Sequence, residues 1–86
     1  MKRVILSPHV LLKLDVLARH GWHLAPQQLE ATVLAPERVD QGYAGRKVAQ
    51  VGLDETHVLR VVYEETGQDL VIVTVYPGRR ERYDKD

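Results

Sequence analysis

The alternation of apolar and polar positions near the C-terminal end of the chain predicts two neighbouring β-strands. In residues 57–64 successive side chains point to opposite faces, so Arg60 shares its face with two valines. Residues 70–75 are apolar on both faces, which is typical of a central strand covered by helices on at least one side. The intervening segment 66–69 contains a glycine and predicts a short hairpin, so the two strands are expected to pair antiparallel.

The N-terminal third of the chain has the pattern of a capped helix. Ser7-Pro8 predicts the helix start, since serine is a preferred N-cap and proline suits the first helical position. The helix is expected to run to about Arg19 and to stop at Gly21. Residues 2–6 predict either a short first strand or a lead-in to this helix. The apolar face of the helix is predicted to consist of Val10, Leu14 and Leu17, with Leu11 and Ala18 beside them.

A second helix and two further strands follow. The helix is expected to begin at Pro26 and to end before Pro36, because proline disfavours a helical conformation in the residue before it. The remaining expected elements are an edge strand over 39–42, a turn over 42–45 and a strand over 46–53. The residues of this second helix that are predicted to face inward are Leu29, Val33 and Leu34.

This order of elements predicts one α+β domain over residues 1–86. An N-terminal helical hairpin would pack on a three- to four-stranded, mainly antiparallel sheet. The 86 residues are too few for two cores. The other face of the sheet would be open, and either Arg60 or its strand neighbours would look out from it.

The segment 76–83, Tyr-Pro-Gly-Arg-Arg-Glu-Arg-Tyr, concentrates the candidate chemistry. Pro77-Gly78 is expected to end the strand, so three arginines and a tyrosine would emerge from a rigid part of the sheet. Guanidinium groups beside phenols suit phosphate recognition and base stacking. A solvated tail is the alternative. For Arg60 three arrangements are open: its side chain extends to the edge of the sheet, it pairs with Glu64 or Asp54, or it forms the floor of an anion site.

These residues carry a resemblance to a known family. Arg60-Val61-Val62-Tyr63, residues 71–75, Gly78-Arg79-Arg80-Glu81-Arg82 and Tyr83 resemble the C-terminal half of the RelE-type toxins. His20-Gly21 is similar to the Lys-His-Gly motif of the BrnT branch of that superfamily. The resemblance covers about a third of the chain. It implies a RelE-like fold and a small ribonuclease that cuts mRNA, often on the ribosome, and is held inactive by a cognate antitoxin.

Carried over to this sequence, the resemblance assigns catalytic roles to Arg60, Arg80, Arg82 and Tyr83. We add His57 as a further proton-transfer candidate, with His20 and His23 as alternatives, because histidine titrates near neutral pH. The residues that we expect to bind substrate are Arg79, Lys13 and Arg19.

Composition limits these assignments. Twelve basic residues balance 12 acidic ones, so net charge does not attract RNA over long distances. This balance keeps open a non-catalytic RNA- or protein-binding module on the same fold. An exposed sheet edge that pairs with a second copy, or with an antitoxin segment, is a third possibility.

Cofactors and membrane attachment are not expected. The sequence has no cysteine, so disulfides and cysteine-ligated metal sites are excluded. Histidines at positions 9, 20 and 23 raise the possibility of a metal site, but no nearby carboxylate completes a convincing set. No stretch approaches the roughly 18 apolar residues of a membrane span, and we expect the protein to be cytoplasmic.

Overall fold

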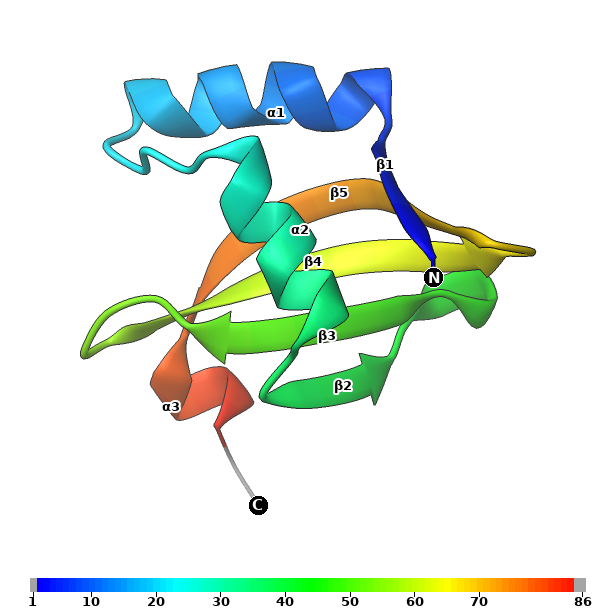
Figure 1. The fold of residues 1–86 in the computed structure, drawn as a ribbon. Helices are drawn as coiled ribbons and strands as arrows, with labels where there is room; N and C mark the ends of the chain where they lie inside the picture. Colours follow the sequence, from blue (N-terminus) through cyan, green and yellow to red (C-terminus); the bar gives the residue numbers. More distant parts are fainter. Residues whose placement is uncertain (1, 85–86) are drawn as a thin grey trace.

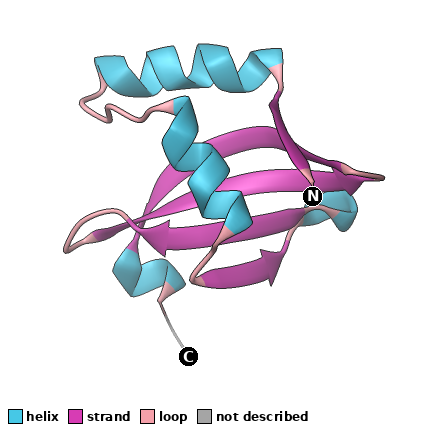
Figure 2. Ribbon diagram, viewed as in Figure 1, coloured by secondary structure: helices cyan, strands magenta, loops and turns pink. Residues whose placement is uncertain are grey.

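In the computed structural model, which describes residues 2–84, a five-stranded sheet carries its two longer helices on one face (Figures 1 and 2). The α+β class is therefore confirmed, but the sheet has five strands instead of the expected three or four. The elements are β1 (Arg3–Leu6), α1 (Pro8–Arg19), α2 (Pro26–Leu34), β2 (Arg38–Gln41), the 3₁₀ turn η1 (Tyr43–Gly45), β3 (Lys47–Gly52), β4 (His57–Thr66), β5 (Asp69–Arg79) and α3 (Arg80–Tyr83).

The fifth strand is the N-terminal segment itself. The strand order is β1-β5-β4-β3-β2, and β1 lies parallel to β5 while all other neighbours are antiparallel. Residues 3–6 thus form a strand instead of a mere lead-in to the helix. A parallel pair needs a long crossover. Here the crossover is the rest of the chain, because β1 and β5 lie at opposite ends of the sequence.

Helices α1 and α2 cover the same face of the sheet but pack on different strands (Figure 1). Helix α1 contacts β5, and α2 contacts β3 and β4. The two helices run in different directions in Figure 1, so the expected antiparallel hairpin is not confirmed. Because β1 precedes them, the helices are also not strictly N-terminal.

The core lies between these helices and the sheet. Leu11 and Leu34, which were expected inside, are exposed to solvent. Each helical residue advances about 100° around the axis, so a neighbour of a buried residue readily falls outside the buried stripe. The core side chains are Val10, Leu14, Leu17, Leu29, Val33, Ala49, Leu59, Val61, Tyr63, Leu70, Ile72 and Val75.

A β-bulge changes the register between β4 and β5. Tyr63 lies opposite Ile72, but the residue before it, Val62, lies opposite Thr74. Strand β5 therefore has one extra residue at Val73. Before the bulge the even-numbered residues of β5 point into the core, and after it the odd-numbered residues do. Val75 therefore points into the core, and Tyr76 points to the face of the sheet opposite α1 and α2, which we call the far face.

The expected strand end at Pro77-Gly78 is wrong. Strand β5 continues to Arg79, with Pro77 opposite Leu59 and Gly78 opposite Val58. Strand β1 pairs only with residues 69–72 of β5, so one side of β5 has no strand neighbour where Pro77 lies. A residue without an N–H is tolerated at such an edge. The ladder thus carries the arginine segment one residue further before α3 begins.

Candidate functional site

Arg60 lies on the far face and is buried, with only 6% of its surface exposed. Its Nε donates to the Tyr76 hydroxyl at 3.0 Å, and its Nη1 donates to Asp40 Oδ2 at 3.1 Å and to Gln50 Oε1. The strand register places Gln50 and Tyr76 directly opposite Arg60 on the two neighbouring strands. The guanidinium is therefore held in one orientation by three side chains.

The expected ion-pair partners of Arg60 were wrong. Glu64 instead accepts a hydrogen bond from Arg46 Nε at 2.7 Å. Asp54 lies in the β3–β4 turn and accepts hydrogen bonds from the backbone amides of Thr56 and His57. The actual carboxylate partner, Asp40, comes from edge strand β2, which is 20 residues away in sequence.

The charges around Arg60 are mutually stabilised. Hydrogen bonds from Arg38 and Arg60 hold the pKa of Asp40 below its usual value, although burial opposes this shift. Burial also disfavours the charged form of Arg60, but its bonds to Tyr76 and Asp40 outweigh this effect and raise its pKa. Arg60 and Asp40 thus form a charged pair at neutral pH.

The short helix α3 covers Arg60 from outside. The Arg60 Cζ lies 4.1 Å from the centroid of the Tyr83 ring, and the Tyr76 and Tyr83 ring centroids are 6.3 Å apart. Such a distance to the ring centroid gives a cation–π contact. The carbonyl of Tyr83 accepts a hydrogen bond from Arg38 Nη1 at 2.8 Å. Arg60 is therefore stacked under an aromatic ring in addition to its polar contacts.

The sheet beneath α3 is shaped to receive it. Gly52, Val58 and Gly78 face one another across β3, β4 and β5, and we call this row the glycine trough. A Cβ built on Gly78 would lie 2.4 Å from the Tyr83 ring, and one on Gly52 would lie 2.5 Å from Arg80 Nη2. Val58 is only 1% exposed. Both glycines thus provide space for the side chains of α3.

Further hydrogen bonds fix α3 in the trough. Arg80 Nε donates to the Asp54 carbonyl and Arg80 Nη1 to Asp84 Oδ2, both at 2.8 Å. Gln50 Nε2 donates to Asp84 Oδ1 at 3.0 Å, so the same glutamine contacts Arg60 and the end of α3. The Arg80 amide donates to the Thr56 carbonyl at 2.9 Å. The C-terminal arginine segment is therefore an ordered part of the fold up to residue 84.

The structure brings together three of the expected catalytic residues, Arg60, Arg80 and Tyr83. Arg82 is exposed, and its Cζ lies 5.6 Å from the Tyr83 ring centroid. Arg79 and Arg80 line a surface pocket of about 210 Å³ together with Glu55, Thr56 and Glu81. Two basic and two acidic side chains thus share this pocket, which is a polar hollow at the end of the sheet.

His57 lies at the same end of the sheet but belongs to the face that carries the helices. Its Nδ1 is 3.1 Å from Asp54 Oδ1 and 2.8 Å from Thr56 Oγ1. Its ring packs edge-on against the Trp22 ring, with 4.8 Å between the ring centroids. Bonds from the amide of Thr56 and from His57 hold the pKa of Asp54 below its usual value, against the effect of burial. A carboxylate beside one ring nitrogen is the usual way to orient a catalytic histidine. Arg79 is the residue opposite His57 in the ladder.

Lys13 and Arg19 do not join this group. Both belong to α1, so the sheet separates them from Arg60, and Arg19 pairs with Asp15 one turn earlier at 2.9 Å. Within residues 2–84, no three histidine or carboxylate side chains gather as a metal site would require. Over the same residues, none of the helices is both long and apolar enough to cross a membrane.

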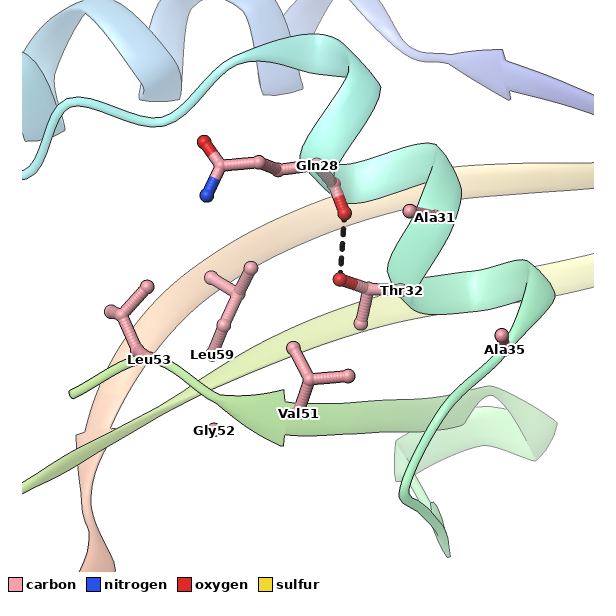
Figure 3. Close-up of a pocket in the computed structure, with 8 residues that line it drawn as sticks. All are labelled: Gln28, Ala31, Thr32, Ala35, Val51, Gly52, Leu53 and Leu59. Atoms are coloured by element: carbon pink, nitrogen blue, oxygen red, sulfur yellow. Dashed lines mark hydrogen bonds between the residues drawn. The ribbon is translucent and has the colours of Figure 1, made fainter. Parts of the chain in front are cut away.

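A second pocket, of about 320 Å³, lies between α2 and β3 (Figure 3). The Thr32 hydroxyl in its wall donates to the Gln28 carbonyl at 2.7 Å. None of the described residues that line it is charged, so it does not suit phosphate chemistry. The lining residues are Gln28, Ala31, Thr32, Ala35, Val51, Gly52, Leu53 and Leu59.

Sequence reasoning missed the residues that surround Arg60. The contact with Gln50 depends on the exact length of the β3–β4 connection, in which Gly52 pairs with Val58, and a shift of one residue there would place a different residue opposite Arg60. Tyr76 was not predictable either, because without the bulge Val75 would lie opposite Arg60. The roles of Gly52 and Gly78 as space for α3 also depend on where the C-terminal turn folds back.

Comparison with known proteins leaves the family unassigned. No protein-family model, no curated protein and no solved structure matches this chain. The functional argument therefore depends on the residues and on their arrangement.

Proposed function

We propose that this protein is a RelE/BrnT-like endoribonuclease that cleaves mRNA at the sheet end where β5 meets α3. The proposal combines the sequence resemblance with one observation: Arg60, Arg80 and Tyr83 lie together on the far face, at one end of the sheet. The cytoplasm is the proposed setting, and a cognate antitoxin is the partner that the resemblance implies.

The reaction that fits these groups is attack of a ribose 2′-hydroxyl on the adjacent phosphate. The 2′-oxygen forms a bond to phosphorus, the bond to the 5′-oxygen breaks, and the products are a 2′,3′-cyclic phosphate and a free 5′-hydroxyl. One proton leaves the 2′-hydroxyl and one joins the departing oxygen. Negative charge gathers on the phosphoryl oxygens, where fixed guanidinium donors stabilise it.

The residues take distinct roles in this proposal. Arg79, Arg80 and Arg82 contact phosphates, because they surround the polar hollow or lie exposed beside it. Arg60 supplies a fixed cationic plane beneath Tyr83. The two proton-transfer candidates are His57, oriented by Asp54, and the phenol of Tyr83.

The test is cleavage of a defined message by purified protein, in a bacterial translation extract and on naked RNA. Arg80→Ala is expected to lower the cleavage rate by about a hundredfold or more, the usual effect of removing one well-placed donor. Arg46→Ala is a matched control, because its side chain is 36% exposed against 38% for Arg80 and also pairs with one carboxylate. Cleavage by Arg80→Ala at the wild-type rate would remove the catalytic assignment.

A non-catalytic RNA- or protein-binding module is the second candidate. It is favoured by the contacts of Arg60 and Arg80, whose Nε and Nη1 atoms already have protein partners. This candidate predicts salt-sensitive binding of RNA, or binding of a protein, without any cleaved product. The same cleavage assay separates the two, since a module leaves the message intact in every variant.

A further inference from the structure

The end of α3 fills a site whose shape and donors suit a different ligand. The Tyr83 ring stacks on the Arg60 guanidinium, above the backbone of Gly78. The next residue, Asp84, presents a carboxylate to the Gln50 amide nitrogen. An aromatic ring followed by an anionic group is also the layout of a nucleotide, with its base and phosphate.

The site itself is built from the sheet and does not depend on α3. Arg60 is held by Asp40, Gln50 and Tyr76, which lie on three different strands. Gly78 leaves a flat gap beside it, which the Tyr83 ring occupies and which a Cβ at this position would fill. A guanidinium plane and a flat backbone surface are the features on which unstacked nucleobases stack.

The side-chain hydrogen bonds that hold α3 lie at or near the surface. Helix α3 has four residues, and tyrosine is its one apolar anchor, since the others are Arg80, Glu81 and Arg82. The Arg80–Asp84 ion pair is partly exposed on both sides. Exposed ion pairs of this kind contribute little to stability. Local opening of a four-residue turn without a fully buried side chain costs much less than global unfolding.

We propose that the slot beside Arg60 and Gly78 is a nucleobase-binding site of single-stranded RNA, and that Tyr83 and Asp84 plug it in the resting protein. Opening of α3 frees the Gln50 amide from Asp84. The base then stacks on Arg60 in place of Tyr83, and this amide reaches the adjoining phosphate. This inference deepens the proposed function, because it makes α3 the element that controls access of RNA to Arg60.

The test measures binding of a short, fluorescein-labelled 2′-O-methyl RNA, which the 2′-hydroxyl mechanism cannot cleave. Tyr83→Ala removes the plug and is expected to tighten binding about tenfold, as for a site that is open only about a tenth of the time in the wild type. Tyr83→Phe keeps the ring and is expected to bind like the wild type. Wild-type affinity for Tyr83→Ala would overturn the inference.

A double variant distinguishes a slot for a planar base from mere exposure of the Arg60 charge. In Tyr83→Ala/Gly78→Ala a methyl group occupies the gap, so the tenfold gain should disappear. An abasic oligonucleotide with the same backbone should likewise show no gain with Tyr83→Ala. A gain that survives in the double variant or on the abasic chain would contradict a base slot.

An NMR titration of the wild-type protein gives a readout that does not depend on how the variants fold. At saturating oligonucleotide the Gly78 amide and the Tyr83 ring signals are expected to shift, and unmoved signals would overturn the site. Failure of this inference is distinguishable from failure of the proposed function. If the wild type cleaves no RNA but Tyr83→Ala binds the oligonucleotide more tightly, the nucleobase site is supported and the ribonuclease proposal is contradicted.

Discussion

The two faces of the sheet are stabilised in different ways. The face under α1 and α2 is closed by aliphatic side chains, among which Ile72 is fully buried. The far face is closed at one end by a cation, Arg60, with Gln50, Tyr76 and the Tyr83 ring around it. The first face needs apolar area alone, which is non-directional. The second needs hydrogen-bond geometry, which only a fixed register supplies.

This difference bears on function. A buried guanidinium costs desolvation energy even when it is hydrogen-bonded, and apolar residues of similar volume often replace such a group without loss. Stability alone therefore does not explain Arg60. A cationic plane that is held rigid next to a flat gap fits a recognition site, and the far face is where α1 and α2 leave room for one.

The largest expected effect comes from breaking the apolar face. Ile72→Ala should lower the free energy of unfolding by about 3 kcal/mol, because it removes buried methyl groups and leaves a cavity. Chemical denaturation followed by circular dichroism measures this loss. Leu12→Ala is the control, since Leu12 is 71% exposed and should change stability little. Equal losses in the two variants would show that Ile72 does not anchor the core.

A smaller effect is expected at the far face. Arg60→Ala should cost about 2 kcal/mol, because it leaves the Gln50 oxygen without its donor and the Tyr83 ring without its cation. Asp40 retains Arg38, so the cost stays below that of an orphaned buried charge. Arg60→Lys keeps the charge but lacks the planar fork. If the lysine variant unfolds at the wild-type denaturant concentration, charge alone stabilises this face.

The smallest expected effect is a pH dependence of stability that comes from Glu65, near the hairpin between β4 and β5. Hydrogen bonds from Lys2 and Lys47 lower the pKa of Glu65 from its usual 4.5 to about 2. The unfolded chain therefore binds the proton more readily, so this contribution is present above pH 4.5 and is lost as the pH falls towards 2. Glu65→Gln should flatten the acid side of the stability curve, measured by urea unfolding at successive pH values. High salt should shrink the difference, because the pair is solvent-exposed.

Local sequence patterns predicted much of the helix-covered face. The start of α1 at Ser7-Pro8, its buried residues Val10, Leu14 and Leu17, and the hairpin between β4 and β5 all follow from short-range rules. Such rules work there because proline at the first helical position, turn formation and burial on one helix face each act over a few residues. The Ser7 hydroxyl itself makes no capping bond and instead donates to the Val73 carbonyl.

The far face was not predictable in the same way, because it depends on register over long distances. The sequence by itself determined that Arg60 and its valine neighbours share a face, through the alternation of side chains in a strand. The tertiary structure decided what Arg60 contacts. One extra residue at Val73 brings Tyr76 opposite it, β2 brings Asp40 to it, and the return of the chain at Arg79 places Tyr83 over it. A single-residue shift exchanges the two faces of a strand, so no local pattern fixes these partners.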